Sequence, residues 1–414
     1  MSNDTEVRIQ LATDSMPVMA RLGERFTVEQ PLRDVLIAAD LHLLPSTVPL
    51  LLAYRRAGAR LVVTGSNSAS TQDGIADWLA QQPGIEVIED DDGLVGTAAM
   101  LDRRPDVVID EADAMLGLLH AERSWQLAEL TGACVHTLAG VKRLRSFHRR
   151  RGLTLPVMVV DGSELKSTFD NRHGTGASAL DAVVGLTNVS IAGSVLVVAG
   201  FGHVGRGIAE RARGLGAQVL VTEIDPLRAL EAHALGYRVL SLTEAAREAT
   251  VLLTATGSRR VVRAEHLALL PEGAILANAG HGTAEIDLPA LTAANDERRR
   301  VLPGVEEHTT ASGRRILLLA GGNPVNTAGG SGHAAAAMDL SFAAQALSVT
   351  SLVTRRPGPG LHELGTEIQQ EVARLALAAR GVPLDPPSPG HAIYSDYLTG
   401  EPELAALDAS QEQM

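Results

Sequence analysis

Three glycines near the middle of the chain have the spacing of a phosphate-binding turn. The apolar segment 195–199 runs directly into Gly200, Gly202 and Gly205, and residues 206–215 have a helical pattern. In such a strand–turn–helix unit Gly200 allows the tight turn, Gly202 lets the backbone approach a pyrophosphate, and Gly205 allows close helix–strand packing. The free N–H groups at the helix N-terminus complete a predicted dinucleotide site.

A carboxylate after the next predicted strand distinguishes between the two common dinucleotides. The strand Gln218–Thr222 is followed by Glu223, at the distance of about 20 residues from the loop that is typical of a ribose-binding acid. A carboxylate there accepts hydrogen bonds from a ribose diol and repels a 2′-phosphate, so NAD is favoured over NADP. The alternative, an acidic helix cap, explains Glu223 without explaining the loop.

Short Val- and Ile-rich segments alternate with helix-length segments on both sides of the loop. This alternation forces right-handed crossovers and gives mostly parallel sheets buried on both faces. We therefore predict an α/β fold with two doubly wound parallel-sheet domains. The predicted strands are residues 35–39, 60–63, 107–109 and 157–160, and then 194–199, 218–222, 251–255, 274–278 and 316–320. Predicted helices at 334–349 and 363–379 are expected to return to the first domain.

The charge balance of the chain and its uncharged stretches bear on whether it binds nucleic acid, a membrane or a metal. The chain has 36 Lys and Arg against 49 Asp and Glu, a net charge of −13, which disfavours nucleic acid because that binding depends on clustered cations. The uncharged stretches 182–205 and 316–338 are interrupted by Gly, Asn, Ser and Thr, so neither is expected to span a membrane. The acidic run 89–92 is expected to be solvated, and no metal site is predicted.

The number of cysteines and the pattern of the N-terminal residues indicate in which cellular compartment the protein is expected. The single cysteine, Cys134, cannot form an intrachain disulfide, and the first residues lack the basic-then-apolar pattern of a secretory signal. We therefore expect a cytoplasmic protein.

Several further segments, together with the loop, resemble one enzyme family. The segments are 16–25, 41–42, 70–73, 169–176, 197–216, 222–233, 278–281, 285–287 and 326–333. In these segments, which span most of the chain, the sequence resembles S-adenosylhomocysteine hydrolase, a family that uses a tightly held NAD to oxidise a nucleoside, eliminate a group from it and add another.

The resemblance implies a domain division and a reaction. It implies a split substrate domain (1–176 and 334–382), an inserted Rossmann NAD-binding domain (177–333), a C-terminal tail (383–414) and a homo-oligomer, a dimer or the family's tetramer. In the family NAD takes a hydride from the nucleoside 3′ carbon, which makes the 4′ proton acidic. The 5′ thiolate then leaves, water adds, and the hydride returns. The expected partner is thus a small-molecule nucleoside.

The resemblance also assigns catalytic roles. Lys166 and Asp170 match the pair that contacts the ribose 3′ hydroxyl and assists its deprotonation; a surface ion pair is the alternative. His42 and His281 match histidines near the 5′ position, where imidazole can protonate the leaving atom. The acidic segment 110–113 follows a predicted strand, and either Asp110 or Glu111 takes the place of the family's carboxylate, with Asp110 slightly favoured.

Binding roles follow from the same matches. The expected NAD contacts are Thr137, Asn171, Gly200, Gly202, Val204, Gly205, Glu223, Arg228, Asn278, Ala279, Gly280 and Asn326. Leu44, His136 and His333 are the expected substrate contacts, and His333 matches a hinge histidine that contacts the base; a helix-capping role is its alternative.

The substrate side departs from the family pattern. Residues 136–140 are His-Thr-Leu-Ala-Gly where the family has Glu-Thr-Thr-Thr-Gly, whose Glu reads the adenine amino group. Leu44 and Ser46 stand in place of Thr and Glu, and the last residues lack the family's Lys and Tyr. Retained redox residues beside an altered pocket indicate a specialised relative acting on a modified nucleoside. The alternatives are the ordinary hydrolase, a catalytically silent NAD-binding paralogue and an unrelated NAD-dependent dehydrogenase.

Overall fold

The computed structural model describes residues 3–66, 71–89, 94–111, 114–280, 282–293 and 298–385. Residues up to Ala376 form one compact unit that contains both sheets, and the residues from Leu377 onward form a second unit, whose described part is the end of α16 and the segment after it. The tail predicted at 383–414 falls almost entirely outside the described residues.

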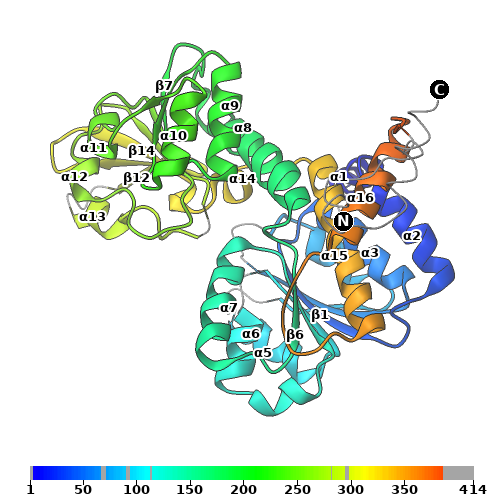
Figure 1. Ribbon diagram of the computed structural model, residues 1–414. Coiled ribbons are helices and arrows are strands. Elements are labelled where there is room, and N and C mark those ends of the chain that lie inside the picture. Colours follow the sequence, from blue (N-terminus) through cyan, green and yellow to red (C-terminus); the bar gives the residue numbers. More distant parts are fainter. Residues whose placement is uncertain are drawn as a thin grey trace, which may run out of the picture. The chain divides into compact units, whose positions relative to one another are not determined.

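The first sheet has seven parallel strands in the order β15-β6-β5-β4-β1-β2-β3. Its strands β1 and β6 are labelled in Figure 1. Both faces are buried: Ile37 and Ala39 of β1 contribute to one core, and Ala38 to another. Helices α1, α2, α3 and α15 contribute to the first core, and α5, α6 and α7 to the second. The strands are β1 Leu36–Leu41, β2 Arg60–Gly65, β3 Ile85–Val87, β4 Val107–Asp110, β5 Gly132–Val135, β6 Pro156–Val159 and β15 Gly360–Glu363.

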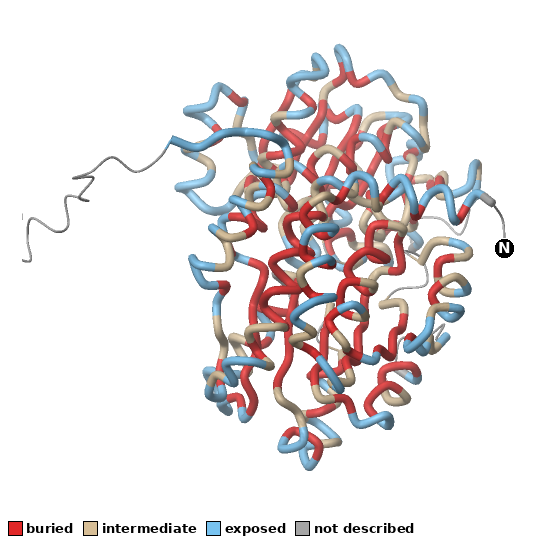
Figure 2. The backbone as a smooth tube through the Cα atoms, turned by 90° about the vertical axis from the view of Figure 1, so that its right-hand side faces the viewer, coloured by how far each residue is buried: buried red, intermediate tan, exposed pale blue. Residues whose placement is uncertain are grey.

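The helices associated with this sheet come from both ends of the unit. They are α1 Asn3–Asp14, α2 Pro17–Glu29, η1 Pro45–Thr47, α3 Val48–Arg56, α4 Ile75–Ala80, α5 Leu94–Asp102, α6 Ala114–Ala121, η3 Ser124–Ala128, α7 Leu138–Arg151, α15 Ala335–Arg355 and α16 Thr366–Ala379. Among the described residues, α15 is the helix long and apolar enough to be considered as a membrane span by composition. Most of its central residues are buried in the protein, which accounts for its apolar character. Figure 2 shows buried residues running through the interior and exposed residues mainly at the outer loops.

The second sheet has eight strands in the order β12-β13-β14-β11-β10-β7-β8-β9. The strands from β14 to β9 are parallel, whereas β12, β13 and β14 pair antiparallel at one edge. The strands are β7 Val195–Ala199, β8 Gln218–Thr222, β9 Arg238–Val239, β10 Val251–Thr254, β11 Ile275–Asn278, β12 Arg298–Leu302, β13 Val305–Thr309 and β14 Arg315–Leu319. The predicted α/β class with two parallel-sheet-rich domains is confirmed, with an antiparallel edge that was not predicted.

Helices bury both faces of this sheet as well. One core takes side chains from α8, α9 and α14, and the other takes them from α11, α12 and α13. The helices are η4 Lys166–Thr175, α8 Gly176–Thr187, α9 His203–Gly214, α10 Pro226–Ala234, α11 Leu242–Ala245, α12 Ala264–Leu267, α13 Leu288–Ala293, η5 Ala320–Gly322 and α14 Val325–Ala328. Element η4 is a π-helix, a rare form that is frequent at functional sites. The residue boundaries predicted for the domains stay predictions.

Candidate active site

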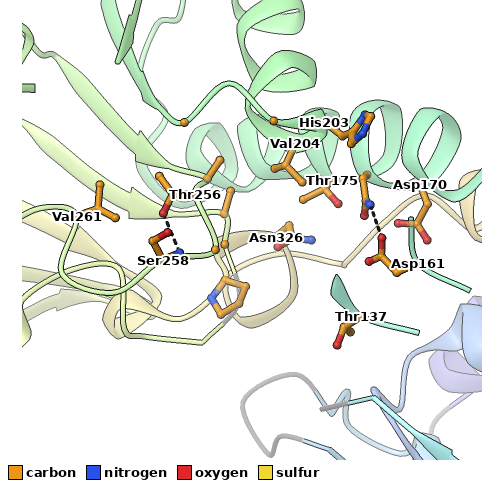
Figure 3. Close-up of a pocket in the computed structure, with 18 of the residues that line it drawn as sticks. Thr137, Asp161, Asp170, Thr175, His203, Val204, Thr256, Ser258, Val261 and Asn326 are labelled. Carbon is orange, nitrogen blue, oxygen red and sulfur yellow. Dashed lines mark hydrogen bonds between the residues drawn. The ribbon is translucent and has the colours of Figure 1, made fainter. Parts of the chain in front are cut away.

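A cavity of about 1160 Å³ is lined by residues from the carboxyl ends of strands in both sheets, by η4 and by the start of α9 (Figure 3). The ends of parallel strands are where α/β folds place their ligands, because loops of different strands converge there. The glycine loop and the Lys166–Asp170 pair both open into this cavity. A dinucleotide and a second ligand can therefore meet in it.

The glycine loop has the close approaches that its spacing predicts. Gly200 has φ of +101°, and a Cβ on it would lie 2.8 Å from the Ala255 carbonyl oxygen. A Cβ on Gly205 would lie 1.8 Å from the Gly200 carbonyl oxygen, so only glycine fits there. Gly202 is the N-cap of α9, and because it has no side chain it cannot cap the helix with a side-chain hydrogen bond. These features fit a pyrophosphate lying against the N-terminus of α9, where Val204 also lines the cavity.

Glu223 lies at the end of β8 with its carboxylate held by the backbone. Its Oε2 accepts a hydrogen bond from Phe201 N at 2.7 Å, and its Oε1 accepts from Ile224 N at 2.7 Å and Asp225 N at 3.0 Å. Glu223 and Arg228 both line the cavity. The acidic helix cap that was the alternative for Glu223 is not observed, because the N-cap of α10 is Asp225, and the ribose contact of Glu223 stays a prediction.

Some of the residues expected to contact NAD at its nicotinamide end line the cavity, and Asn278 lies behind them. Ala279, Gly280 and Asn326 line the cavity. Asn278, expected to be an NAD contact, is completely buried behind the lining: its Oδ1 accepts from Gly280 N at 2.7 Å and its Nδ2 donates to Gly322 O at 2.9 Å. Asn278 thus supports the lining, because these bonds use its amide to join two loops, and its contact with NAD stays a prediction.

Asp170 is the centre of a buried polar cluster. Its Oδ2 pairs with Lys166 Nζ and accepts from Ser341 Oγ at 2.6 Å, while His333 Nδ1 lies 3.1 Å from Oδ1. Burial raises the pKa of the Asp170 carboxyl, but the nearby charges of Lys166 and His333 outweigh burial and hold that pKa well below its usual value. With side chains only 7 % and 1 % exposed, Lys166 and Asp170 are not the surface ion pair that was their alternative.

His136 belongs to this same cluster. Its Nε2 lies 3.7 Å from Asp170 Oδ2, and its Nδ1 lies 3.0 Å from Gln345 Oε1. The change from Glu to His was expected to affect the reading of the base. The structure instead groups His136 with the pair expected to handle the ribose 3′ hydroxyl.

Of the two histidines predicted to lie near the 5′ position, the structure describes His42. His42 follows β1, lines the cavity with Leu44, and has its Nδ1 3.1 Å from Ser66 Oγ. His281 lies outside the described residues.

The two acids after β4 differ in their position relative to the cavity. Asp110 does not line the cavity: its Oδ2 accepts from Leu116 N at 2.8 Å, which holds the carboxylate against α6. Glu111 lines the cavity, and its backbone oxygen accepts a hydrogen bond from Thr137 Oγ1. Glu111 is therefore the acid of this pair that lies at the cavity, against the slight preference for Asp110, and which of the two is catalytic stays a prediction.

Several site residues were missed in the sequence. Ser341, Phe342 and Gln345 lie on α15, and Asp161 accepts from Asn171 Nδ2 at 3.3 Å (Figure 3). The available signal was the polar series 341, 345 and 348 at helical spacing within an apolar segment. Within the described ranges no three His, Cys, Asp or Glu side chains gather as metal ligands, and of the acidic run 89–92 only Glu89 is described.

Comparison with known proteins identifies the family. Residues 171–332 match the family described as "S-adenosyl-L-homocysteine hydrolase, NAD binding domain". The chain is 39 % identical to an adenosylhomocysteinase of Nostoc sp. over 95 % of this chain and 94 % of the relative. It is 40 % identical to an S-inosyl-L-homocysteine hydrolase of Methanothermobacter thermautotrophicus over 92 % of this chain and 93 % of the relative.

A solved structure of a dipicolinate synthase from Bacillus halodurans aligns with 72 % of this chain and 95 % of its own at a TM-score of 0.47 and 13 % identity. Family membership follows from the extent and identity of the two sequence matches, which cover nearly the whole of each chain. The chain is therefore an NAD-binding enzyme of the adenosylhomocysteinase family.

Proposed function

We propose that this enzyme oxidises a nucleoside at its 3′ carbon, eliminates the 5′ substituent and adds a nucleophile in its place, with NAD regenerated at the end of each cycle. One observation carries the proposal: the buried Lys166–Asp170 pair and the glycine loop open into the same cavity. When bound, NAD supplies the hydride acceptor and returns the hydride. A silent binding protein would have no need for proton-transfer groups at this place.

The residues of the chain divide into those that hold the cofactor and those that handle protons. The glycine loop and Val204 would hold the pyrophosphate, Glu223 a ribose, and Gly280 with Asn326 the nicotinamide end. Lys166 and Asp170 would hold the 3′ hydroxyl. His42, on another strand end of the same cavity, would exchange a proton with the atom that leaves from the 5′ carbon.

The proposed substrate differs from S-adenosylhomocysteine in its base or its 5′ substituent. Leu44 and Ser46 both line the cavity, in place of the Thr and Glu of the family pattern. Neither side chain can supply a carboxylate acceptor to an exocyclic amino group. The relative named S-inosyl-L-homocysteine hydrolase supports a base other than adenine in an enzyme with this framework.

A substrate panel tests the proposal. NAD-loaded enzyme is mixed separately with S-adenosylhomocysteine, S-inosylhomocysteine and adenosine, and the near-ultraviolet absorbance of reduced nicotinamide and the release of thiol are followed. We expect reduction with at least one nucleoside, and a higher kcat/KM for a compound other than S-adenosylhomocysteine. Highest kcat/KM with S-adenosylhomocysteine would establish the ordinary hydrolase, and failure of every nucleoside to reduce the cofactor would refute the redox cycle.

A further inference from the structure

Glu285 is a buried carboxylate behind the wall of the cavity. The residue is 1 % exposed, and the turn after β10 supplies its hydrogen bonds. Thr256 donates to Oε2 through its N at 3.0 Å and its Oγ1 at 2.8 Å, and Gly257 N donates to Oε1 at 2.6 Å. The carboxylate is the acceptor in each of these bonds, which is the role of its ionised form. Among the described residues, no Lys, Arg or His forms an ion pair with it.

Gly280 is the point at which this carboxylate comes close to the cavity. Gly280 follows β11 and lines the cavity, and a Cβ on it would lie 1.7 Å from Glu285 Oε1. The carboxylate therefore occupies the space that a side chain at position 280 would fill. Because glycine has no side chain, a ligand that contacts Gly280 comes close to the negative charge.

Hydrogen bonds from two strand ends fix the position of this charge. Gly280 N donates to Asn278 Oδ1 at 2.7 Å, and Thr254 Oγ1 donates to the same atom at 3.0 Å. Ser258 N donates to Thr256 Oγ1 at 3.0 Å, a bond drawn in Figure 3. The turns after β10 and β11 are thus tied to each other, and the carboxylate between them is a positioning group.

Lys142 brings a positive charge to the same turn. Its Nζ lies 3.6 Å from the position that a Cβ on Gly257 would take, and the residue is exposed. Solvent and salt screen the charge of an exposed side chain, whereas a buried charge is screened much less. Glu285 therefore acts more strongly than Lys142 on a group in the cavity.

We propose that the Glu285 carboxylate favours the oxidised form of the bound nicotinamide and so makes the cofactor a weaker hydride acceptor. This inference rests on the proposed function, in which Gly280 lies at the nicotinamide end. Hydride acceptance removes the positive charge of a nicotinamide ring, so a nearby negative charge stabilises the oxidised form more than the reduced form.

The proposed role concerns an equilibrium and requires no chemical change in Glu285. The hydride passes between the 3′ carbon and NAD, and the carboxylate exchanges neither a proton nor an electron. A weaker hydride acceptor gives the hydride back more readily at the end of the cycle. Glu285 thus helps to keep the resting enzyme in the oxidised form that starts each turnover.

The test measures the relative affinity of the enzyme for NADH and NAD, with no nucleoside present. Enzyme with its bound nucleotide is equilibrated with mixtures of NAD and NADH, and the nucleotides that it retains are separated and quantified. By linkage, this relative affinity gives the change in reduction potential on binding. Glu285→Gln removes the charge and keeps the shape, and we expect the relative affinity for NADH to rise about tenfold. A tenfold change is about 30 mV for a two-electron couple.

Two further variants separate the charge at the cavity from other effects. Glu272 precedes β11 at the opposite end of the strand, its Oε2 accepts from Arg315 N at 2.8 Å, and it lies outside the cavity lining. Glu272→Gln should therefore keep the wild-type preference within about twofold. Glu285→Asp keeps the charge, so its preference should lie closer to the wild type than to Glu285→Gln.

Thr256→Val tests the inference without removing the carboxylate, in case Glu285→Gln does not fold. It deletes the hydroxyl donor to Oε2, so the charge is less compensated and the preference should move toward NAD. An unchanged preference in Glu285→Gln, equal preferences in Glu285→Gln and Glu285→Asp, or a shift toward NADH in Thr256→Val would overturn the inference. Because no nucleoside is present, these results leave the proposed function intact, and failure of the substrate panel would not alter them.

Discussion

Asp170 shows how one buried carboxylate can link stability to function. A buried charge is costly unless it is paired and hydrogen-bonded, and here Lys166 and Ser341 provide the pair and the bond. The same contacts leave the cluster with donors in fixed positions at the cavity. Loss of the carboxylate is thus expected to affect both folding and the binding of a hydroxyl.

Replacing this carboxylate should change the response of stability to acid. The pKa of Asp170 in the folded state lies well below that of an ordinary Asp, which is about 3.9 in an unfolded chain. Its stabilisation is therefore complete above that pH and is lost as the pH falls toward the folded-state pKa. Asp170→Asn should be about 3 kcal/mol less stable at neutral pH because Lys166 is left unpaired, and this difference should shrink in acid.

Denaturant unfolding at a series of pH values checks this prediction. Asp181→Asn is the control, because Asp181 has a side chain 65 % exposed and lies 3.8 Å from Arg211. It should change the free energy of unfolding by less than about 1 kcal/mol. An Asp170→Asn difference that does not vary with pH would show that the carboxyl pKa is not lowered by folding.

Single residues of the site were predictable where the chain keeps them close in sequence. Lys166 and Asp170 are four residues apart on one helix, and Gly200 to Glu223 lie within one strand–helix–strand unit. Gln345 lies 209 residues from the His136 that it contacts, and no local pattern connects them. The preference for Asp110 over Glu111 does not agree with the cavity lining, because sequence could not show which of two adjacent acids turns back to the backbone of α6.

At the scale of elements, the turn between β7 and α9 has the tightest contacts of the cofactor site. Gly205→Ala would place a methyl group against the Gly200 carbonyl oxygen, which is backbone and cannot move aside alone. We expect a loss of about 3 kcal/mol of stability and loss of bound NAD, measured as nucleotide released on denaturation.

The same helix provides the comparison. A Cβ on Gly214, at the end of α9, would meet nothing within 4 Å. Gly214→Ala should keep NAD and change stability by less than about 1 kcal/mol. Equal NAD content in the two alanine variants would show that the close approach at Gly205 is not required.

The start of α2 depends on a side chain from α15. Asp339 is completely buried and accepts hydrogen bonds from Val18 N at 3.0 Å and Met19 N at 2.8 Å. Asp339→Ala should cost about 3 kcal/mol, because it leaves two buried donors unsatisfied. At the exposed N-cap of α10, Asp225→Ala should cost only about 1 kcal/mol. Thermal and denaturant unfolding compare the two, and equal losses would contradict the role assigned to Asp339.

Most interior strands with continuous apolar sequence were predicted, whereas the buried interior strand β5 and the edge strands of both sheets were not. The strand predicted at residues 218–222 is β8 itself, and the predicted strands 107–109 and 251–255 agree with β4 and β10 within one residue at each end. Segment 298–302 begins with three arginines, so it has no buried-strand pattern. It forms β12 because its backbone pairs with β13, and such pairing does not need apolar side chains.

At the scale of the described unit, the first core joins distant parts of the chain. β15 pairs with β6, with Gly360 opposite Pro156, and residues of α15 share a core with α2 and α3. Predicted helices after residue 334 were expected to return to the first domain, and α15 does pack there. β15 was missed because its four residues include only one that is buried.

The single cysteine reports on this core. Cys134 is fully buried in β5, and burial raises the pKa of its thiol. Since the thiolate is the reactive form, a thiol reagent should not modify the native enzyme during turnover and should modify one thiol per chain in denaturant. Rapid modification of the native enzyme at neutral pH would contradict the burial of β5.

The central claim is that oxidation at the 3′ carbon makes the neighbouring 4′ proton removable within this cavity. The most direct measurement is exchange at that carbon: NAD-loaded enzyme is incubated with its nucleoside in D₂O, and recovered nucleoside is analysed by NMR and mass spectrometry. We predict deuterium at C4′ in the wild type and none with Asp170→Asn. Recovery of undeuterated nucleoside from an enzyme that visibly reduces its cofactor would contradict the account.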